Sequence, residues 1–366
     1  MPHINQLKTL MIKIKLFTVI TLSLILNSCH GQKNKNELQP STSVKKLEEN
    51  ISNAKNDEYS FFSDSNNQIS QVIRTIFQDS KGDIWFGGEG GAFRFSHNSL
   101  THIDSIRSKS GKRVTIKDIA EDNNGKIWLG HTDGISSIDG NTVTNYYESD
   151  GLISNDVWSI AADKNGKIWV GTIDGVCIFN GQKFTEFVLP EGKIDPTLGI
   201  SSTKMVHSIF EDSKGTLWFS SNAGLFSYAN NSLTNVSKEV GIQTNFVNEI
   251  FEDKNGELWV STKIGLYNLT NGKAKNITKG KIETGKGIGS IAEDKDGNLW
   301  FVSNQHSLYT YNKGILIEYK KAENNKGPVV FKILKDQHNR LWFVGFGGAF
   351  RLENGKFINV TKNGPW

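Results

Sequence analysis

Short apolar runs separated by polar turn residues fill most of the chain, and one arrangement of them recurs seven times. In the clearest copy, two such runs, residues 247–252 and 257–262, flank the quartet Asp253-Lys254-Asn255-Gly256. Asp at the first position of a turn caps the backbone, and Gly at the fourth accepts a positive φ, so the quartet favours a type I turn. The pattern therefore predicts two antiparallel strands, followed by two more over residues 265–269 and 274–278.

The repeats share a strict spacing of three residue types. An Asp stands six residues before each repeat's tryptophan and an Ile stands nine before it, as Asp79 and Ile76 do in the first copy. Self-similarity at a fixed period of about forty residues indicates a repeat architecture. The seven tryptophans are Trp85, Trp128, Trp169, Trp218, Trp259, Trp300 and Trp342.

Each repeat predicts one four-stranded meander. Dipeptides such as Asn180-Gly181 and Asn271-Gly272 suit the tight turn between third and fourth strands. The strands are apolar on both faces, so each sheet must be stacked between neighbours. Successive tryptophans are 43, 41, 49, 41, 41 and 42 residues apart, which is typical of β-propeller blades. We therefore predict an all-β fold, a seven-bladed β-propeller of four-stranded antiparallel blades.

Two further features bear on the propeller's core and closure. The seven tryptophans are predicted to be core residues, and burying about 200 Å² each would supply at most about 5 kcal/mol between blades. Residues 90–94 and 347–351 are the same pentapeptide, Gly-Gly-Ala-Phe-Arg, in two blades that touch in a closed ring. Full four-strand sets run from about residue 71 to 362, so no strand need be exchanged across the seam.

The N-terminal residues have the pattern of an export signal peptide. Lysines precede an apolar run over residues 16–26, which is short for a membrane span. The sequence Leu26-Asn27-Ser28-Cys29 resembles the lipobox of bacterial lipoproteins, which implies lipidation of Cys29, with plain secretion as the alternative. Residues 32–57 are polar and predict a tether. We thus expect a signal peptide over 1–28, a disordered tether over 29–69 and the propeller over 70–366.

Composition narrows the partners. Without the three lysines of the predicted signal, 39 basic and 38 acidic residues remain, so neither nucleic acid nor another polyanion is an expected partner. Only the lipid anchor is expected to meet the membrane. The resemblance to lipoproteins implies the outer membrane, because His30 follows Cys29 in place of the aspartate that often retains lipoproteins at the inner membrane. We expect a monomer without an internal disulfide, in which Cys177 packs in the core.

Recognisable catalytic chemistry is absent from the sequence. No histidine pair has metal-ligand spacing, and no nucleophile elbow, phosphate loop or zincin helix occurs. The segment starting at Asp294 begins like a calcium loop, but its glycine is misplaced and position twelve is Gln305. We therefore predict no cofactor, no metal and no enzymatic activity.

Candidate binding residues lie where the repeats stop agreeing. In a meander, the second-to-third turns and the connections between blades share one rim, and loops held by a rigid scaffold carry function. Eleven residues before each tryptophan, at what we call the mouth position, stand Arg74, Lys117, Trp158, His207, Asn248, Gly289 and Phe331. Four residues after it, at the turn position, stand Glu89, Thr132, Ile173, Asn222, Lys263, Asn304 and Phe346.

These two sets could surround the mouth of the central channel with cations, amides and aromatic faces, a mixture that suits sugars. The alternative is a solvated rim whose residues drift. His131 is a further candidate, because it could approach His207 across the mouth. The insertion over residues 189–200 falls on the same rim, either as a lid or as a tolerated surface loop.

The repeat pattern, with its Ile, Asp, Gly, Trp and later Gly-Leu, resembles the two-component regulator propeller repeat over about residues 70–362. In that family such propellers commonly form the periplasmic sensor half of hybrid histidine kinases, many of which detect oligosaccharides. This sequence shows no membrane-spanning or ATP-binding segment after the repeats, so we expect a stand-alone propeller without direct signalling.

The resemblance implies an exported, non-catalytic propeller that binds a small-molecule or glycan ligand, most readily an oligosaccharide. Two alternatives stay open. One is a scaffold that binds another envelope protein. The other is a lyase, because the streptogramin lyases are propellers of similar appearance, and it predicts loss of turnover when His131 or His207 is changed.

Overall fold

The computed structural model describes residues 67–194, 202–283, 285, 287–319 and 329–366. The predicted signal peptide, Cys29 and nearly all of the predicted tether lie outside these residues, as does the second half of the insertion at 189–200. The expectations about them remain predictions.

The described chain contains seven four-stranded antiparallel sheets, which we number as blades 1 to 7 in chain order. In each, the strands pair in sequence order, as in β1-β2-β3-β4. The first strands are β1 (Ile73–Gln78), β5 (Ile116–Glu121), β9 (Val157–Ala162), β13 (Val206–Glu211), β17 (Val247–Glu252), β21 (Ile288–Glu293) and β25 (Val329–Lys335). The second strands are β2 (Ile84–Gly88), β6 (Ile127–His131), β10 (Ile168–Thr172), β14 (Leu217–Ser221), β18 (Leu258–Thr262), β22 (Leu299–Ser303) and β26 (Leu341–Phe346).

The outer half of each blade is equally regular. The third strands are β3 (Gly91–Ser96), β7 (Gly134–Asp139), β11 (Gly175–Phe179), β15 (Gly224–Ala229), β19 (Gly265–Thr270), β23 (Ser307–Asn312) and β27 (Gly348–Glu353). The fourth strands are β4 (Ser99–Ile103), β8 (Thr142–Tyr146), β12 (Phe184–Phe187), β16 (Ser232–Asn235), β20 (Lys273–Asn276), β24 (Ile315–Tyr319) and β28 (Lys356–Val360). The short helices η1 (Glu148–Asp150) and α3 (Val236–Val240) are the described helical elements.

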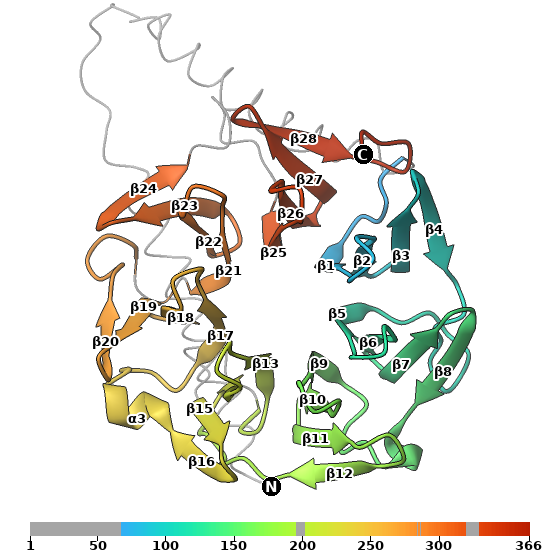
Figure 1. Cartoon of the computed structure of the whole chain (residues 1–366), viewed down its shortest axis with the longest axis horizontal. Helices are drawn as coiled ribbons and strands as arrows, with labels where there is room; N and C mark the ends of the chain where they lie inside the picture. The colour runs from blue at the N-terminus through green and yellow to red at the C-terminus, as the bar shows by residue number, and fades with distance from the viewer. Residues whose placement is uncertain (1–66, 195–201, 284, 286, 320–328) are drawn as a thin grey trace, which may run out of the picture. The chain divides into compact units, whose positions relative to one another are not determined.

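The blades form a ring, with the first strands innermost and the fourth strands outermost (Figure 1). This is the predicted seven-bladed β-propeller. Blades 1 and 7 each complete their sheet from consecutive strands, so the expectation that no strand crosses the seam is confirmed.

The spacing of Asp and Trp follows from a hydrogen bond made in every blade. One carboxylate oxygen of the Asp accepts the indole N–H, at 2.8 to 3.0 Å in all seven copies. The other oxygen accepts backbone N–H groups of the turn, as Asp163 does from Asn165 and Lys167. The Asp therefore shapes the turn and also satisfies the one polar atom of a buried Trp.

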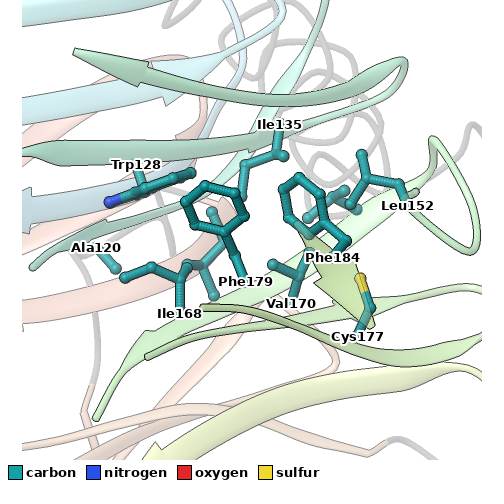
Figure 2. Close-up of a cluster of buried hydrophobic side chains, with 11 residues drawn as sticks. Ala120, Trp128, Ile135, Leu152, Ile168, Val170, Cys177, Phe179 and Phe184 are labelled. Carbon is teal, nitrogen blue, oxygen red and sulfur yellow. The ribbon is translucent and has the colours of Figure 1, made fainter. Parts of the chain in front are cut away.

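The hydrophobic core consists of seven clusters, and each lies between two blades. The repeated spacing places the Trp of one blade against the outer strands of the next, as Trp128 shares a core of blades 2 and 3 with Val170, Phe179 and Phe184 of the second, third and fourth strands (Figure 2). Trp342 of blade 7 packs in the same way on Ile84 and Phe86 of blade 1. The seven tryptophans are 1 to 8% exposed, so the core assignment is confirmed and the ring is closed. Cys177 is likewise fully buried.

Polar contacts on the rim opposite the second-to-third turns also link neighbouring blades. A Glu seven residues before a Trp accepts the backbone N–H that follows the Asp of the preceding blade, as Glu252 does from Ser213 at 2.7 Å. The same contact joins Glu121 to Ser80, Glu211 to Lys164 and Glu293 to Lys254. Across the seam, Gln78 accepts from Gln337 at 2.7 Å.

Both ends of the described chain reinforce the seam. Gln68 forms a β-bridge with Thr361 beyond β28, and Ile69 is 2% exposed. Residues 67–69, which we assigned to the end of the tether, thus pack on blade 7. Trp366 in turn stacks on Phe95 of blade 1, with ring centroids 4.1 Å apart.

Candidate functional site

The seven first strands surround the centre of the ring (Figure 1). Their residues line a cavity of about 670 Å³. Every residue at the mouth position lines this cavity: Arg74, Lys117, Trp158, His207, Asn248, Gly289 and Phe331. The structure therefore brings this first predicted set together.

A β-bulge accounts for the placement of the mouth position. In six blades the pairing register between first and second strands shifts across this residue, as between Ile73 and Thr75 in blade 1, and in blade 6 it shifts between Ile288 and Ile291. A bulged residue is left out of the ladder, and the bulge re-aims its side chain. The spacing from the Trp identified the mouth position, but no sequence pattern indicated the bulge that directs its side chain to the cavity.

The turn position lies beside the mouth position because of a backbone hydrogen bond. In six blades its N–H donates to the carbonyl of the residue thirteen before the Trp, as Lys263 does to Phe246 at 3.2 Å. Only some of these side chains reach the cavity. Lys263 and Asn304 line it, whereas Glu89, Asn222 and Phe346 contact residues that do.

Three cations at the mouth each lie over an aromatic ring. Lys117 Nζ is 3.6 Å from the ring centroid of Trp158, and both side chains bond the carboxylate of Asp156. Arg74 lies 5.1 Å over Phe331 and 3.4 Å from Glu89.

The third cation, Lys263, lies 5.5 Å over Phe246, a residue that sequence reasoning missed. Phe246 stands in the connection between blades 4 and 5, outside both predicted sets. Its ring also lies 4.7 Å from that of His207. The position thirteen before each Trp carries six residue types in the seven repeats, and that variation is the signal that could have found it.

His207 is held as a neutral ring of defined tautomer. The amide nitrogen of Asn222 donates to the Ser202 carbonyl, so its oxygen accepts from His207 Nε2, at 2.7 Å. Burial lowers the pKa of His207 to about 4, and nearby Lys263 acts in the same direction. At neutral pH, His207 therefore presents Nδ1 as an acceptor.

His131 is not brought to the mouth. Its side chain is fully buried in blade 2, where Nε2 bonds the Ser136 hydroxyl at 2.9 Å, and burial lowers its pKa to about 4. The structure thus corrects its assignment as a candidate contact, because His131 ends β6 and its side chain is buried against Ser136 of β7 within its own blade.

A second ring of polar side chains lies directly below the mouth, and sequence reasoning missed it. The residue ten before each Trp, which we call the inner position, is polar in all seven repeats and lines the cavity: Thr75, Asp118, Ser159, Ser208, Glu249, Ser290 and Lys332. Four of them accept the backbone N–H of the buried Ile in the next blade. Ser159, for example, accepts from Ile209 at 2.8 Å. The uniform polarity of this position was visible in the sequence.

One ion pair at the inner position joins blades that are not neighbours. Lys332 Nζ of blade 7 lies 2.5 Å from Glu249 Oε1 of blade 5, and the small residues Gly289 and Ser290 stand on the blade between. Burial disfavours the charged form of Lys332, but attraction by Glu249 and Asp118 outweighs it and raises the pKa. This pair is part of the cavity lining below the mouth residues.

Asp118 lies at the same level without an ion pair among the described residues. Desolvation raises the pKa of its carboxyl to about 6, although Lys332 and the N–H of Ile160 favour the charged form. Because the folded protein then binds a proton that the unfolded chain has lost, Asp118 costs stability progressively as pH rises from about 4 to 6.

Replacing Asp118 with Asn should remove this cost. The free energy of unfolding of Asp118→Asn minus that of the parent protein should increase by about 1–2 kcal/mol between pH 4 and 7. This range allows for screening of the Asp118 charge by water in the channel. Urea unfolding at several pH values measures the increase, with Asp296→Asn on the opposite rim as control. The lowered pKa of His207 makes the stability of both proteins increase with pH, and this contribution cancels when the variant is compared with the parent. A difference that does not change with pH would contradict the assignment.

No group of three or more His, Cys, Asp or Glu residues in the described chain could hold a metal ion. No helix within the same residues is long and apolar enough to cross a membrane.

Comparison with known proteins bears on the repeat itself. The family model for the two-component regulator propeller matches residues 67–90, 151–174, 199–223, 241–263 and 283–305. Each matched segment contains the Trp and the Asp six residues before it. These segments are repeats of the two-component regulator propeller type. No curated protein matches it in sequence.

Solved structures with this fold include signalling and enzymatic proteins. This propeller matches the extracellular domain of a proposed one-component system from B. thetaiotaomicron with a TM-score of 0.62, 19% identity and coverage of 76% of this chain. It spans 38% of that chain. For the extracellular domain of a proposed hybrid two-component system from the same organism, the values are 0.53, 26%, 65% and 33%. Virginiamycin B lyase from Staphylococcus aureus gives 0.61 and 16%, covering 77% of this propeller and 95% of the lyase.

Proposed function

We propose that this chain is an exported, non-enzymatic propeller that binds an oligosaccharide at the mouth of its channel. The observation that carries the proposal is the convergence of all seven mouth positions on one cavity of about 670 Å³, although no two of them carry the same side chain. That volume lies within the range of small-molecule sites. A uniform frame with a diversified mouth is what selection for a ligand would produce.

The chemistry of the mouth supports a sugar. Trp158, Phe246 and Phe331 line the cavity, and aromatic faces stack on the apolar faces of sugar rings. Asn248 and the Nδ1 acceptor of His207 add hydrogen-bonding groups among them. The similarity to extracellular domains of signalling systems agrees with export, and we propose that Cys29 anchors the protein by a lipid in the outer membrane.

The non-enzymatic part of the proposal rests on the two histidines of the lyase alternative. His131 is enclosed in blade 2, and Nε2 of His207 is committed to Asn222. Neither therefore combines exposure with a free proton-donating nitrogen. The scaffold alternative predicts instead that the tagged protein captures a defined envelope protein and that no glycan competes with it.

Trp158→Ala should weaken binding of a glycan ligand by about tenfold or more, because an aromatic stacking surface is lost. Thermal-shift screening of the full chain against oligosaccharides, followed by calorimetric titration of any hit, measures this. Ile317→Ala, at an exposed site on the outer strand β24, is the control and should bind as the parent does. The absence of any hit, or hits that Trp158→Ala leaves unchanged, would contradict the proposal.

A further inference from the structure

Four cations line the cavity, and three of them form ion pairs within the described residues. Arg74 has Glu89 as its partner, Lys117 has Asp156, and Lys332 below them has Glu249. No acidic side chain of the described residues forms an ion pair with Lys263, which lines the same cavity. Lys263 is half-buried, and its stem packs beside Gly287.

The surroundings of Lys263 combine a charge with a stacking face. Its ammonium group lies over the ring of Phe246, which also contacts His207. His207 is neutral, so Lys263 supplies the charge of this corner. Glu249, on the first strand of the same blade, forms its ion pair with Lys332. The corner defined by Phe246, Lys263 and His207 therefore offers an unneutralised cation, an aromatic face and one hydrogen-bond acceptor.

Resting on the proposed function, we infer that the ligand is an acidic oligosaccharide, with its carboxylate or sulfate group held by Lys263 and the sugar ring lying against Phe246. A charge-assisted hydrogen bond from an ammonium group to an oxyanion is stronger than a neutral one. The ion-paired Arg74 and Lys117 hold their positive charges close to acids of this chain, whereas Lys263 has its charge available for one acidic group of a ligand. This local contact does not need the basic surface that an extended polyanion would require and that the near-neutral composition does not predict.

The decisive probe is a sugar whose charge can be removed without changing its skeleton. Trigalacturonic acid and its fully methyl-esterified form differ only in this respect, and a sulfated disaccharide tests the second kind of acid. Calorimetric titration of the purified full chain should show the acidic trisaccharide or the sulfated disaccharide binding about tenfold or more tightly than the neutral ester. The preference should decrease as salt is added, because ions screen a partly exposed charge.

Lys263→Gln should abolish that preference without affecting folding, and Lys263→Arg should restore most of it. Lys295→Gln, an exposed lysine in a turn of the opposite rim, is the matched control and should keep it. Equal binding of the acid and its ester, or a preference that survives Lys263→Gln, would overturn the inference while leaving the proposed function intact. If neither trisaccharide, nor the sulfated disaccharide, nor any screened neutral glycan binds, both fail.

Discussion

Replacing Trp169 with alanine is expected to lower the free energy of unfolding of the propeller by about 3–5 kcal/mol. Trp169 is 2% exposed and packs from blade 3 onto blade 4, with its ring 5.5 Å from that of Phe219 and 5.9 Å from that of Tyr228. The substitution removes these contacts and leaves a cavity between two blades. Urea unfolding followed by tryptophan fluorescence and circular dichroism measures the change.

Trp169→Phe separates packing from hydrogen bonding. It keeps most of the apolar surface but leaves an oxygen of Asp163 without the indole N–H, which now lies at 2.9 Å. The expected cost is about 1–3 kcal/mol. An alanine variant that loses less than the phenylalanine variant would contradict the role of the tryptophans as links between blades.

The second large effect is expected at the seam. Trp366→Ala should lower the free energy of unfolding by about 2–3 kcal/mol, less than a fully buried tryptophan would. Its ring stacks on Phe95 at 4.1 Å and contacts Phe86 at 6.4 Å, so residues from the end of the chain cover blade 1. Chemical denaturation of the full chain tests this.

Two variants make the seam experiment specific. Trp366→Phe should recover most of the loss, because a ring of this kind can still stack on Phe95. Lys356→Ala, at an exposed site on β28 of blade 7, should change stability by less than about 0.5 kcal/mol. Equal stability of Trp366→Ala and the parent protein would show that the C-terminal residues do not contribute to closure.

Most of the fold was accessible from the sequence because the same physical constraint acts seven times. The Asp in each turn and the Trp after it recur at fixed spacing, and the structure shows that a hydrogen bond ties them. Blade number, strand order and the buried role of Cys177 followed from that repetition. The seam was only partly predictable, because the stacking of Trp366 on Phe95 occurs once and leaves no periodic signal.

The sequence predicted where the site lies but not all of the residues that form it. Variation at the mouth position identified residues that do line one cavity. His131 was misplaced because its position relative to Trp128 cannot show that Ser136 holds it inside the blade. Phe246 was missed because it belongs to a connection between blades, and the pair of Lys332 with Glu249 because it joins strands that are far apart in sequence.

The bulge in each first strand has a consequence for how such a protein could change its specificity. Three successive residues, such as Trp158-Ser159-Ile160, have different surroundings. The first does not pair with the second strand, the second lines the channel below the mouth, and the third is buried. Descendants of this chain could exchange the first residue freely while the next two stay constant. A new specificity would then require single-codon changes at some of seven mouth positions, and none of these changes would open the ring.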